Sequence, residues 1–324
     1  MRAITITDDH RLELVDIPEP VPGEGEILID VVSAGVNRAD VAQAAGVYPP
    51  PPGASELPGL EVSGRRRDTG APVVALLAGG GYAEVVAVPE VQVLPAPAGL
   101  SLAEAGGIIE VAATVVSNLV LEAGLRTEPA GGDGGAAPDP QTVLIHGGTG
   151  GIGAFAIQFA HALGARVLTT VGSDDAVARV RELGADLAWN RHFTDVVSAA
   201  RDAGGADIVL DVVGGPALND NVRMLREFGR LVIIGTLGGA TGELNVGALM
   251  AKRVHLIGTT VRSRAPHDKQ RILDRTRELV WPMLERGQIR VPVQARLPLA
   301  RASEAHNLLR AGGHFGKVIL DVAE

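Results

Sequence analysis

Apolar and polar residues alternate along the first hundred positions of the chain, which is the period of half-buried β-strands. Met1–Asp16 predicts a hairpin with its turn near residues 8–10, and Glu26–Ala34 predicts a longer strand. Asn37–Ala45 predicts a short helix, and further strands are expected at 60–64, 71–77 and 82–88. Short strands separated by Pro- and Gly-rich turns predict a small, mostly β domain that ends near residue 100.

From Ser101 onward, the apolar residues recur at the spacing of α-helices. Ser101 and Glu104 form a capping-box pattern, and a helix is expected over residues 111–123. After residue 140, strands expected at 142–146, 166–171, 186–189, 207–212, 230–234 and 254–259 alternate with helices. This alternation predicts a doubly wound parallel sheet. A long helix at 269–286 and a strand–helix–strand tail at 293–322 are not needed for its six strands. The tail is therefore a candidate to return to the first domain.

A glycine motif follows the first of these six strands. Gly148, Gly150 and Gly153 come directly after the apolar run Thr142–His146, and a helical pattern follows them. Glycines allow a tight turn and a close approach to a pyrophosphate, while the helix start offers free N–H groups and a positive dipole end. The order strand, loop, helix therefore favours a dinucleotide site over a glycine-rich turn that binds nothing. FAD and S-adenosylmethionine also bind to such loops, so the loop alone leaves the ligand open.

Composition narrows the class of protein. The 324 residues suggest two domains, and a hydrophobic content of 46% with 21% charged residues is typical of a soluble globular protein. A net charge of −9 argues against nucleic acid as the main partner. No apolar run is long enough for a membrane span, and no signal peptide is recognised, so the cytoplasm is the default location. The absence of cysteine excludes disulfides and thiolate zinc sites.

The end of the second strand bears on which nicotinamide cofactor is used. NAD-preferring folds commonly place Asp or Glu there, but here Val171 is followed by Gly172 and Ser173. This small pair leaves room for a 2′-phosphate, and Arg191 after the third strand is a candidate positive partner or a surface arginine. Two acidic residues one turn further on, at 174 and 175, weaken the case. The pattern favours NADPH over NADH.

The loops after the fourth and fifth strands complete the expected crevice. Val213 and Gly214 follow the fourth strand, and Gly235–Gly239, which includes Leu237, follows the fifth. In open α/β sheets, ligands bind outside the carboxyl ends of the strands at the point where the strand order reverses. These loops are therefore expected to face the glycine motif.

Motifs along nearly the whole chain resemble one family. GVNRADVAQAAGVY at 35–48 is followed by PPPPGASELPGLEVSG, and further matches are GGGYAEVVAVP, IHGGTGGIGAFAIQFA, DVVGG, LVIIGTLGG, RSR and FGKVIL. The sequence is similar to the zinc-free medium-chain dehydrogenase/reductases known as NADPH:quinone oxidoreductases. The resemblance implies an α/β fold with a GroES-like domain made of residues 1–121 and 262–324. It also implies a Rossmann domain over 122–261 with strand order 3-2-1-4-5-6, and a homodimer formed through the sixth strand.

Zinc is not expected. Zinc-dependent relatives carry Cys where this chain has Asn37, and Gly-His-Glu where it has Gly59, Leu60 and Glu61. Their four-cysteine lobe is also missing. Thiolate and imidazole ligands make such zinc sites, so no metal ligand is assigned and alcohol dehydrogenation is disfavoured.

The resemblance places Asn37 and Tyr48 near the nicotinamide as the candidate catalytic residues. Tyr48 is expected either to donate a hydrogen bond to the acceptor oxygen or to pack against the cofactor; the alternative for Asn37 is capping of the loop before its helix. His146 is expected to be a packed, hydrogen-bonded residue. The loops and the resemblance together predict these cofactor contacts: Thr114, Gly148, Gly150, Gly151, Ile152, Gly153, Gly172, Ser173, Arg191, Val213, Gly214, Gly235, Leu237, Phe315 and Lys317.

The leading hypothesis is an NADPH-dependent quinone oxidoreductase that transfers hydride to a small-molecule quinone without a metal. One alternative is an enone or 2-enoyl thioester reductase of the same superfamily. Another is a weakly catalytic NADPH-binding protein with a structural or RNA-binding role. The chain departs from the family in a shortened hairpin at Gly64–Val73 and in a Gly- and Pro-rich insertion at 126–140, which has no assigned role.

Overall fold

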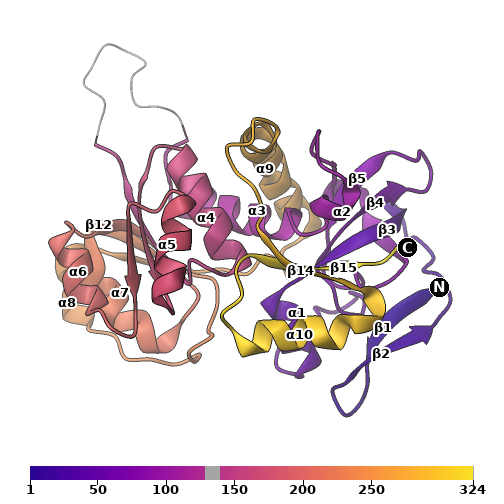
Figure 1. Ribbon diagram of the computed structural model, residues 1–324, viewed down its shortest axis with the longest axis horizontal. Helices are drawn as coiled ribbons and strands as arrows, with labels where there is room; N and C mark the ends of the chain where they lie inside the picture. The colour runs from indigo at the N-terminus through magenta and orange to yellow at the C-terminus, as the bar shows by residue number, and fades with distance from the viewer. Residues whose placement is uncertain (128–138, 324) are drawn as a thin grey trace. The chain divides into compact units, whose positions relative to one another are not determined.

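The computed structural model describes residues 1–127 and 139–323, so the predicted insertion at 126–140 lies mostly outside the described residues. The chain divides into two compact units, coloured along the sequence in Figure 1. Unit 1 comprises Met1–Ala113, Val261–Gly287 and Val291–Glu324. Unit 2 comprises Thr114–Thr260 and Gln288–Arg290. We describe each unit by itself.

Unit 1 is built around a mixed β-sheet. Its elements are β1 (Arg2–Ile6), β2 (Leu12–Asp16), β3 (Glu26–Val36), α1 (Arg38–Ala44), β4 (Glu61–Arg66), β5 (Pro72–Leu76), β6 (Val85–Pro89), the 3₁₀ turn η1 (Glu90–Gln92), β7 (Val93–Pro95), α2 (Leu102–Ala105), α9 (Pro266–Glu285), β14 (Val293–Pro298), the 3₁₀ turn η4 (Leu299–Arg301), α10 (Ala302–Ala311) and β15 (Lys317–Asp321). A seven-stranded sheet has the order β14-β15-β3-β4-β5-β7, and β6 also pairs with β3. The antiparallel pairing of β15 with β3 confirms that the tail returns to the first part of the chain.

Local sequence signals account for several elements of unit 1. The hairpin β1–β2 forms as expected, with His10 at a positive φ in its turn. The capping box is present, because the Ser101 hydroxyl accepts from the Glu104 N–H and the Glu104 carboxylate accepts from the Ser101 N–H. The inward residues of β3 join a core that includes Ile29, Val31, Val62 and Leu320. The mostly β character of this unit follows from its sequence pattern.

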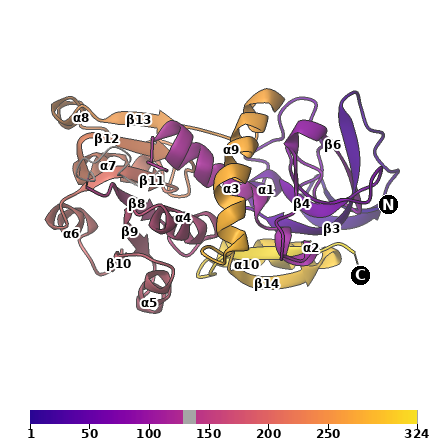
Figure 2. The ribbon, with the colours of Figure 1, turned by 90° about the horizontal axis from the view of Figure 1, so that it is seen from above.

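Unit 2 is the doubly wound unit. Its elements are the π-helical segment η2 (Val116–Glu122), which continues α3 (Ile109–Val115), then β8 (Thr142–His146), α4 (Gly151–Ala162), β9 (Arg166–Val171), α5 (Asp174–Glu182), β10 (Leu187–Asn190), α6 (Val196–Asp202), β11 (Ala206–Asp211), the 3₁₀ turn η3 (Gly215–Ala217), α7 (Leu218–Met224), β12 (Leu225–Ile233), α8 (Val246–Lys252) and β13 (His255–Gly258). All six strands are parallel, in the order β10-β9-β8-β11-β12-β13, as Figure 2 shows. The predicted order is confirmed.

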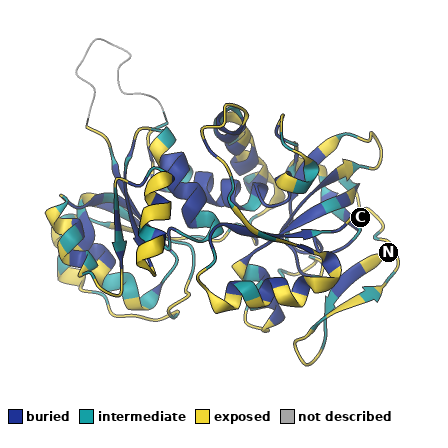
Figure 3. Ribbon diagram, viewed as in Figure 1, coloured by how far each residue is buried: buried dark blue, intermediate teal, exposed yellow. Residues whose placement is uncertain are grey.

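The centre of unit 2 is the buried pair of β8 and α4. Every residue of β8 is buried, as its apolar composition predicts for a strand covered on both faces. In α4, residues 153–160 are all buried, which Figure 3 shows as a dark helix. A helix held this rigidly fixes the loop that precedes it, and that loop is the glycine motif.

Two elements differ from expectation. The helix predicted at 111–123 changes from α to π geometry at Val116. The Asn118 side-chain amide donates to the Thr114 carbonyl at 2.8 Å, the acceptor that the Asn118 N–H would use in an α-helix. The helix α7 ends at Met224, and β12 begins at Leu225, five residues before the strand predicted at 230–234. Leu225 pairs with Ala206, and the register shifts before Ile208 pairs with Arg230.

None of the helices within the described residues combines the length and the hydropathy needed to cross a membrane.

Candidate active site

The glycine motif of unit 2 leaves no room for side chains at two positions. A Cβ at Gly148 would lie 2.3 Å from the Thr169 hydroxyl oxygen, and one at Gly153 would lie 2.2 Å from the Gly147 carbonyl oxygen. The Gly147 and Gly148 N–H groups both donate to the Thr170 carbonyl at 3.1 Å, which ties the loop to β9. The loop is thus packed tightly against the end of the sheet, as a close approach to a phosphate requires.

Gly150 behaves differently from its neighbours in the motif. It is the N-cap of α4, and the nearest atom to a Cβ there is the Gly147 carbonyl oxygen at 3.6 Å, an ordinary contact. A serine side chain would therefore fit here without strain. Gly151, Ile152 and Gly153 form the first turn of α4, whose N–H groups have no partner within the helix. This cradle fits a pyrophosphate.

Gly172 and Arg191 lie next to each other. The Arg191 N–H donates to the Val171 carbonyl at 3.0 Å, and its guanidinium lies over Gly172, where a Cβ would be 3.1 Å from Nη1. Arg191 is exposed and makes no ion pair with any residue that the structure describes. Ser173 caps α5, because its hydroxyl accepts from the Ala176 N–H at 3.3 Å. We call this place the Gly172–Arg191 corner. It brings together the Arg191 cation, the Ser173 hydroxyl and the N-terminus of α5.

The two acidic residues after Ser173 are accounted for by α5. Both lie in its first turn, where negative charge is favourable, and its last turn carries Arg179 and Arg181. The Asp174 carboxylate accepts from the Asn190 side-chain amide at 2.8 Å. Asp174 is thus engaged by the end of β10.

The loops after β11 and β12 are joined to each other. The Asp211 carboxylate accepts from the Val213 N–H at 2.7 Å and the Gly214 N–H at 3.1 Å. The loop that begins at Gly235 is bonded along this segment, with the Leu237 N–H donating to the Val212 carbonyl at 3.0 Å. The Leu237 side chain is 63% exposed. The loops predicted to face the glycine motif therefore form one connected wall at the carboxyl end of the sheet.

His146, the last residue of β8, is a packed residue as expected. Its Nε2 lies 2.7 Å from Asn221 Oδ1, and its Nδ1 lies 2.9 Å from the Thr170 hydroxyl. Both bonds are satisfied when Nε2 donates to Asn221 and Nδ1 accepts from Thr170. Burial lowers the pKa of His146, so the ring is neutral and structural.

A buried ion pair in unit 1 joins Lys317 to Glu61, beside Asn37. We call Asn37, Glu61 and Lys317 the Lys317 cluster. Lys317 Nζ donates to Glu61 Oε1 and to Asn37 Oδ1, both at 2.6 Å, and Asn37 Nδ2 donates to Glu61 Oε1 at 3.1 Å. Glu61 is fully buried and the Lys317 side chain is 3% exposed. Among the described residues, no three His, Asp or Glu side chains are grouped to hold a metal ion.

A second buried polar chain lies next to Asn37. Asp40 accepts from the Asn37 N–H at 2.7 Å and from the Gly59 N–H at 3.2 Å. It also accepts from the Tyr82 hydroxyl at 3.1 Å, and that hydroxyl lies 3.3 Å from His306 Nε2. Burial raises the pKa of Asp40 to about 6 and lowers that of His306 to about 4. Asp40 thus fixes the main chain that carries Asn37.

Arg262 holds the segment that carries Tyr48. Its guanidinium donates to the Tyr48 carbonyl at 3.1 Å, the Ala78 carbonyl at 2.8 Å and Gln43 Oε1 at 2.6 Å, and lies 5.2 Å from the centre of the Tyr48 ring. The Tyr48 hydroxyl makes no hydrogen bond with a described residue. Burial raises the pKa of Tyr48, while the charge of Arg262 lowers it.

The other predicted contacts are divided between the units. Thr114 opens unit 2, whereas Phe315 and Lys317 belong to unit 1. The Phe315 N–H donates to Gln294 Oε1 at 3.1 Å. Sequence reasoning assigned no role to Arg262, Asp40 or Tyr82, although the motifs that carry the resemblance contain all three.

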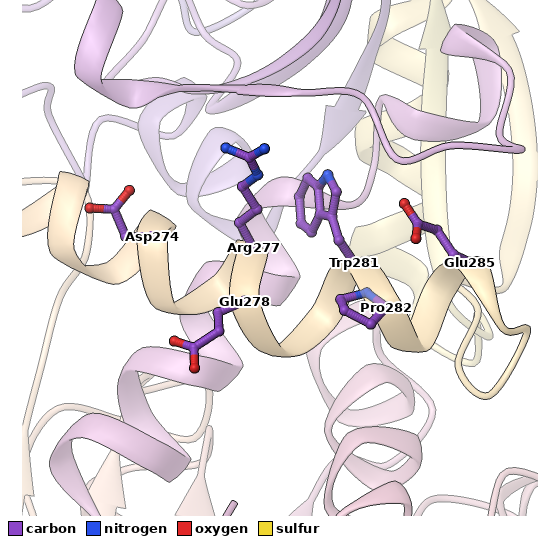
Figure 4. A pocket seen from close by; sticks show the side chains of 6 residues that line it. All are labelled: Asp274, Arg277, Glu278, Trp281, Pro282 and Glu285. Atoms are coloured by element: carbon purple, nitrogen blue, oxygen red, sulfur yellow. The ribbon is translucent and has the colours of Figure 1, made fainter.

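A hollow of about 480 Å³ lies along α9. Its six lining residues all come from that helix, as Figure 4 shows: Asp274, Arg277, Glu278, Trp281, Pro282 and Glu285. None of them is a predicted site residue. Trp281 is held by the Pro95 carbonyl, which accepts from its indole N–H at 2.9 Å. We assign the hollow no function.

Known proteins similar to this chain share its whole length. The sequence model of a family described as zinc-binding dehydrogenase matches residues 151–278. A quinone oxidoreductase of Mus musculus is 27% identical, covering 99% of this chain and 97% of that protein. The quinone oxidoreductase of Thermus thermophilus, solved also in complex with NADPH, is 30% identical with a TM-score of 0.80, over 99% of this chain and 100% of that one. A structure described as an NAD-dependent alcohol dehydrogenase is 28% identical, with a TM-score of 0.83 over 100% of both chains.

The fold, the glycine loop and these relatives all point to the same family of proteins. The chain belongs to the medium-chain dehydrogenase/reductase superfamily, in its quinone oxidoreductase branch. It is an NAD(P)H-dependent oxidoreductase. The zinc in the family description does not bear on the Lys317 cluster, because the match begins at residue 151 and ends at 278.

Proposed function

We propose that the chain reduces a quinone-type acceptor with NADPH and without a metal ion. The Lys317 cluster carries this proposal. Zinc-dependent relatives place ligands at positions 37 and 60, whereas here Asn37 and Glu61 bind a lysine ammonium and Leu60 offers no donor atom. A quinone is already electrophilic, so its reduction does not depend on a Lewis acid, whereas alcohol oxidation in this superfamily does.

Unit 2 supplies the groups that would bind the cofactor. The first turn of α4 offers N–H groups to the pyrophosphate, and the Gly172–Arg191 corner suits a 2′-phosphate. Gly235, Leu237, Val213 and Gly214 lie in the joined loops that would line the nicotinamide side. When bound, the reduced nicotinamide supplies the hydride, and the residues of the chain position it.

Unit 1 supplies the groups that would act on the acceptor. Burial keeps the Tyr48 phenol protonated, so its hydroxyl is a donor for the oxygen on which negative charge develops. Both ends of the Asn37 amide are engaged by Lys317 and Glu61. We therefore assign Asn37 a positioning role, and Tyr48 the contact with the acceptor. Thr114, Phe315 and Lys317 remain proposed cofactor contacts.

The same hydroxyl favours a second candidate function, reduction of an enone or a 2-enoyl thioester. That reaction needs a proton donor for the α-carbon, and the Tyr48 hydroxyl has no hydrogen-bond partner among the described residues. Loss of enal reduction in Tyr48→Phe with quinone reduction retained would favour this role. A weakly catalytic structural or RNA-binding protein would bind NADPH without consuming either acceptor.

The initial rate of loss of reduced-nicotinamide absorbance tests the proposal. NADPH and NADH are compared with a polycyclic quinone and with a 2-enal, and a simple alcohol is tested with the oxidised cofactors. Quinone-dependent oxidation of NADPH is expected. Oxidation of the alcohol with NAD⁺ and not with NADP⁺ would contradict both the proposed quinone acceptor and the proposed NADPH cofactor.

Arg191→Ser tests the cofactor preference separately. We expect the KM for NADPH to rise about tenfold or more, because a charge-assisted contact to phosphate is lost, and the KM for NADH to stay the same. Arg181→Ser is the matched control, since Arg181 is an exposed arginine in the last turn of α5. Equal losses for both cofactors would remove Arg191 from the 2′-phosphate site.

We also propose that β13 pairs with its copy in a homodimer, and that the protein works in the cytoplasm. β13 is an edge strand that bonds only to β12 within its sheet. Exposed apolar side chains lie in β13, where Leu256 is 38% exposed, and in the preceding helix α8, where Val246 is 55% and Met250 71% exposed. Light scattering is expected to give the dimer mass, and Leu256→Lys the monomer mass. An unchanged dimer in the variant would place the interface elsewhere.

A further inference from the structure

One imidazole at the end of β8 is bonded on both sides within unit 2. His146 lies opposite Thr170 in the pairing of β8 with β9, and its Nδ1 lies 2.9 Å from the Thr170 hydroxyl. Its Nε2 lies 2.7 Å from Oδ1 of Asn221 on α7. All three side chains are buried. His146 therefore connects the strand that leads into the glycine motif with a helix that comes 75 residues later in the chain.

The bond to Thr170 repeats a connection that the main chain already makes. The Gly147 and Gly148 N–H groups both donate to the Thr170 carbonyl at 3.1 Å. The ladder between β8 and β9 also runs as far as His146 and Thr170. Without the bond from the Thr170 hydroxyl, the glycine loop would therefore still be attached to β9.

The bond to Asn221 makes a connection of a different kind. Its helix α7 begins directly after the 3₁₀ turn η3, and η3 directly follows the loop of Val213 and Gly214. That loop belongs to the wall at the carboxyl end of the sheet to which we assign the nicotinamide side of the cofactor. The imidazole of His146 thus joins the segment that carries the wall to the residue that precedes the glycine loop.

The Asn221 side chain depends on this one bond. Asn221 is fully buried, and its Nδ2 makes no hydrogen bond with a described residue. A buried amide is costly unless it is bonded, and the bond that Asn221 makes goes to His146. Loss of either partner would leave a buried polar group unpaired. The pair therefore favours one position of the glycine loop relative to α7.

We propose that Asn221 and His146 are positioning residues for the dinucleotide, because their bond sets the place of the glycine loop relative to the loop after β11. The inference rests on the proposed function and deepens it, since both residues act through the loop that would bind the pyrophosphate. Neither side chain takes part in hydride transfer. Without the bond, the glycine loop samples other positions, and the fraction of molecules ready to bind a pyrophosphate falls.

Two substitutions of His146 separate its two bonds. The amide of glutamine reaches as far from the main chain as Nε2 and can keep the bond to Asn221, whereas the shorter amide of asparagine reaches only as far as Nδ1. We expect His146→Gln to bind NADP⁺ as the wild type does. We expect His146→Asn to bind it about tenfold more weakly, which corresponds to a fall of the binding-competent fraction to about one tenth. Asn221→Leu is expected to match His146→Asn, and the double variant to be no weaker than either single variant.

Adenosine 2′-phosphate provides a readout that a general loss of stability would not give. This nucleotide carries the phosphate expected at the Gly172–Arg191 corner but has no pyrophosphate. Isothermal titration calorimetry measures its affinity and that of NADP⁺ for each full-length variant, and thermal unfolding checks that each variant is folded. We expect the affinity for adenosine 2′-phosphate to stay the same in every variant. Equal losses for both ligands, or a glutamine variant as weak as the asparagine variant, would overturn the proposal.

The same titrations separate this inference from the proposed function. If the wild type binds NADP⁺ and both His146→Asn and Asn221→Leu bind it equally well, the positioning role is wrong and the cofactor site stands. If the wild type binds neither NADP⁺ nor adenosine 2′-phosphate, the proposed cofactor site fails and the inference fails with it.

Discussion

Two regions of unit 1 each bury a lysine, and they solve the same electrostatic problem in opposite ways. Around Lys317 the chain supplies the counter-charge itself, through Glu61 and the Asn37 amide, both at 2.6 Å. Around Lys269 no described residue supplies a counter-charge, and Arg262 adds a second cation. A buried charge with an internal partner is part of the fold. A buried lysine without such a partner reduces stability instead.

Removing Lys317 is the largest expected perturbation. Lys317→Met leaves the fully buried Glu61 carboxylate without its cation, and the loss of one partner of a buried pair costs about 3 to 5 kcal/mol of unfolding free energy. Denaturant unfolding monitored by circular dichroism measures it. The double variant Lys317→Met, Glu61→Gln removes both charges and is expected to recover most of the loss. A single variant as stable as the wild type would show that the pair contributes nothing to the fold.

The buried hydrogen-bonded group of Asp40, Tyr82 and His306 lies between these two lysine environments, because the hydrogen-bond partners of the Asp40 carboxyl group are neutral. The folded pKa of Asp40 is about 6, above its ordinary value of 3.8, so its contribution to stability is largest at low pH and is lost as pH rises through 6. The folded pKa of His306 is about 4, below its ordinary value of 6.5, so its contribution grows as pH rises from 4 to 6.5. In the wild type, the contributions of Asp40 and His306 therefore change stability with pH in opposite directions.

Single variants separate the two pH dependences of the unfolding free energy. Asp40→Asn is expected to make stability increase with pH across this window, and His306→Gln to make it decrease, each by on the order of 3 kcal/mol. Unfolding free energies at a series of pH values from 4 to 7 provide the check. Parallel pH profiles for the wild type and both variants would contradict the assigned pKa directions.

Lys269→Met gives the smallest effect and the opposite sign from Lys317→Met. The folded pKa of Lys269 is about 8, below its ordinary value of 10.5, so the wild type loses stability as pH falls through 8. The variant is therefore expected to be more stable than the wild type at pH 7 by about 2 kcal/mol, less than the full pKa shift would give because solvent screens the ammonium in part. This gain should disappear by about pH 10.5, where the lysine is neutral in both states. A variant less stable than the wild type at neutral pH would show that Lys269 has an internal partner.

Much of unit 2 follows from sequence because its signals are local. The buried run Thr142–His146 and the glycines at 148 and 153 are forced by contacts within one strand–loop–helix segment. The meeting of Gly172 and Arg191 also follows, since β9 and β10 are neighbours and their carboxyl ends share one edge of the sheet. The π-helical turn at Val116 was missed, because it depends on a side-chain bond from Asn118.

Unit 1 was less predictable because its polar contacts join distant parts of the chain. Lys317 and Glu61 are 256 residues apart, and Arg262 and Gln43 are 219 apart. Neither pairing leaves a periodic signal. Lys269 sits in a helix whose pattern predicts an amphipathic surface, and only the structure shows that it lies on the buried face. The resemblance named Asn37 and Lys317 as site residues but did not show that they bind each other.

We propose that this oxidoreductase works without zinc, with Lys317, Asn37 and Glu61 bound to one another in unit 1. Quinone-dependent NADPH oxidation by protein dialysed against a zinc chelator, with the metal content of the same sample measured by mass spectrometry, tests it most directly. The account predicts a full rate with far less than one zinc per chain, and no gain when zinc is restored. A rate that falls with chelation and returns with stoichiometric zinc would contradict it.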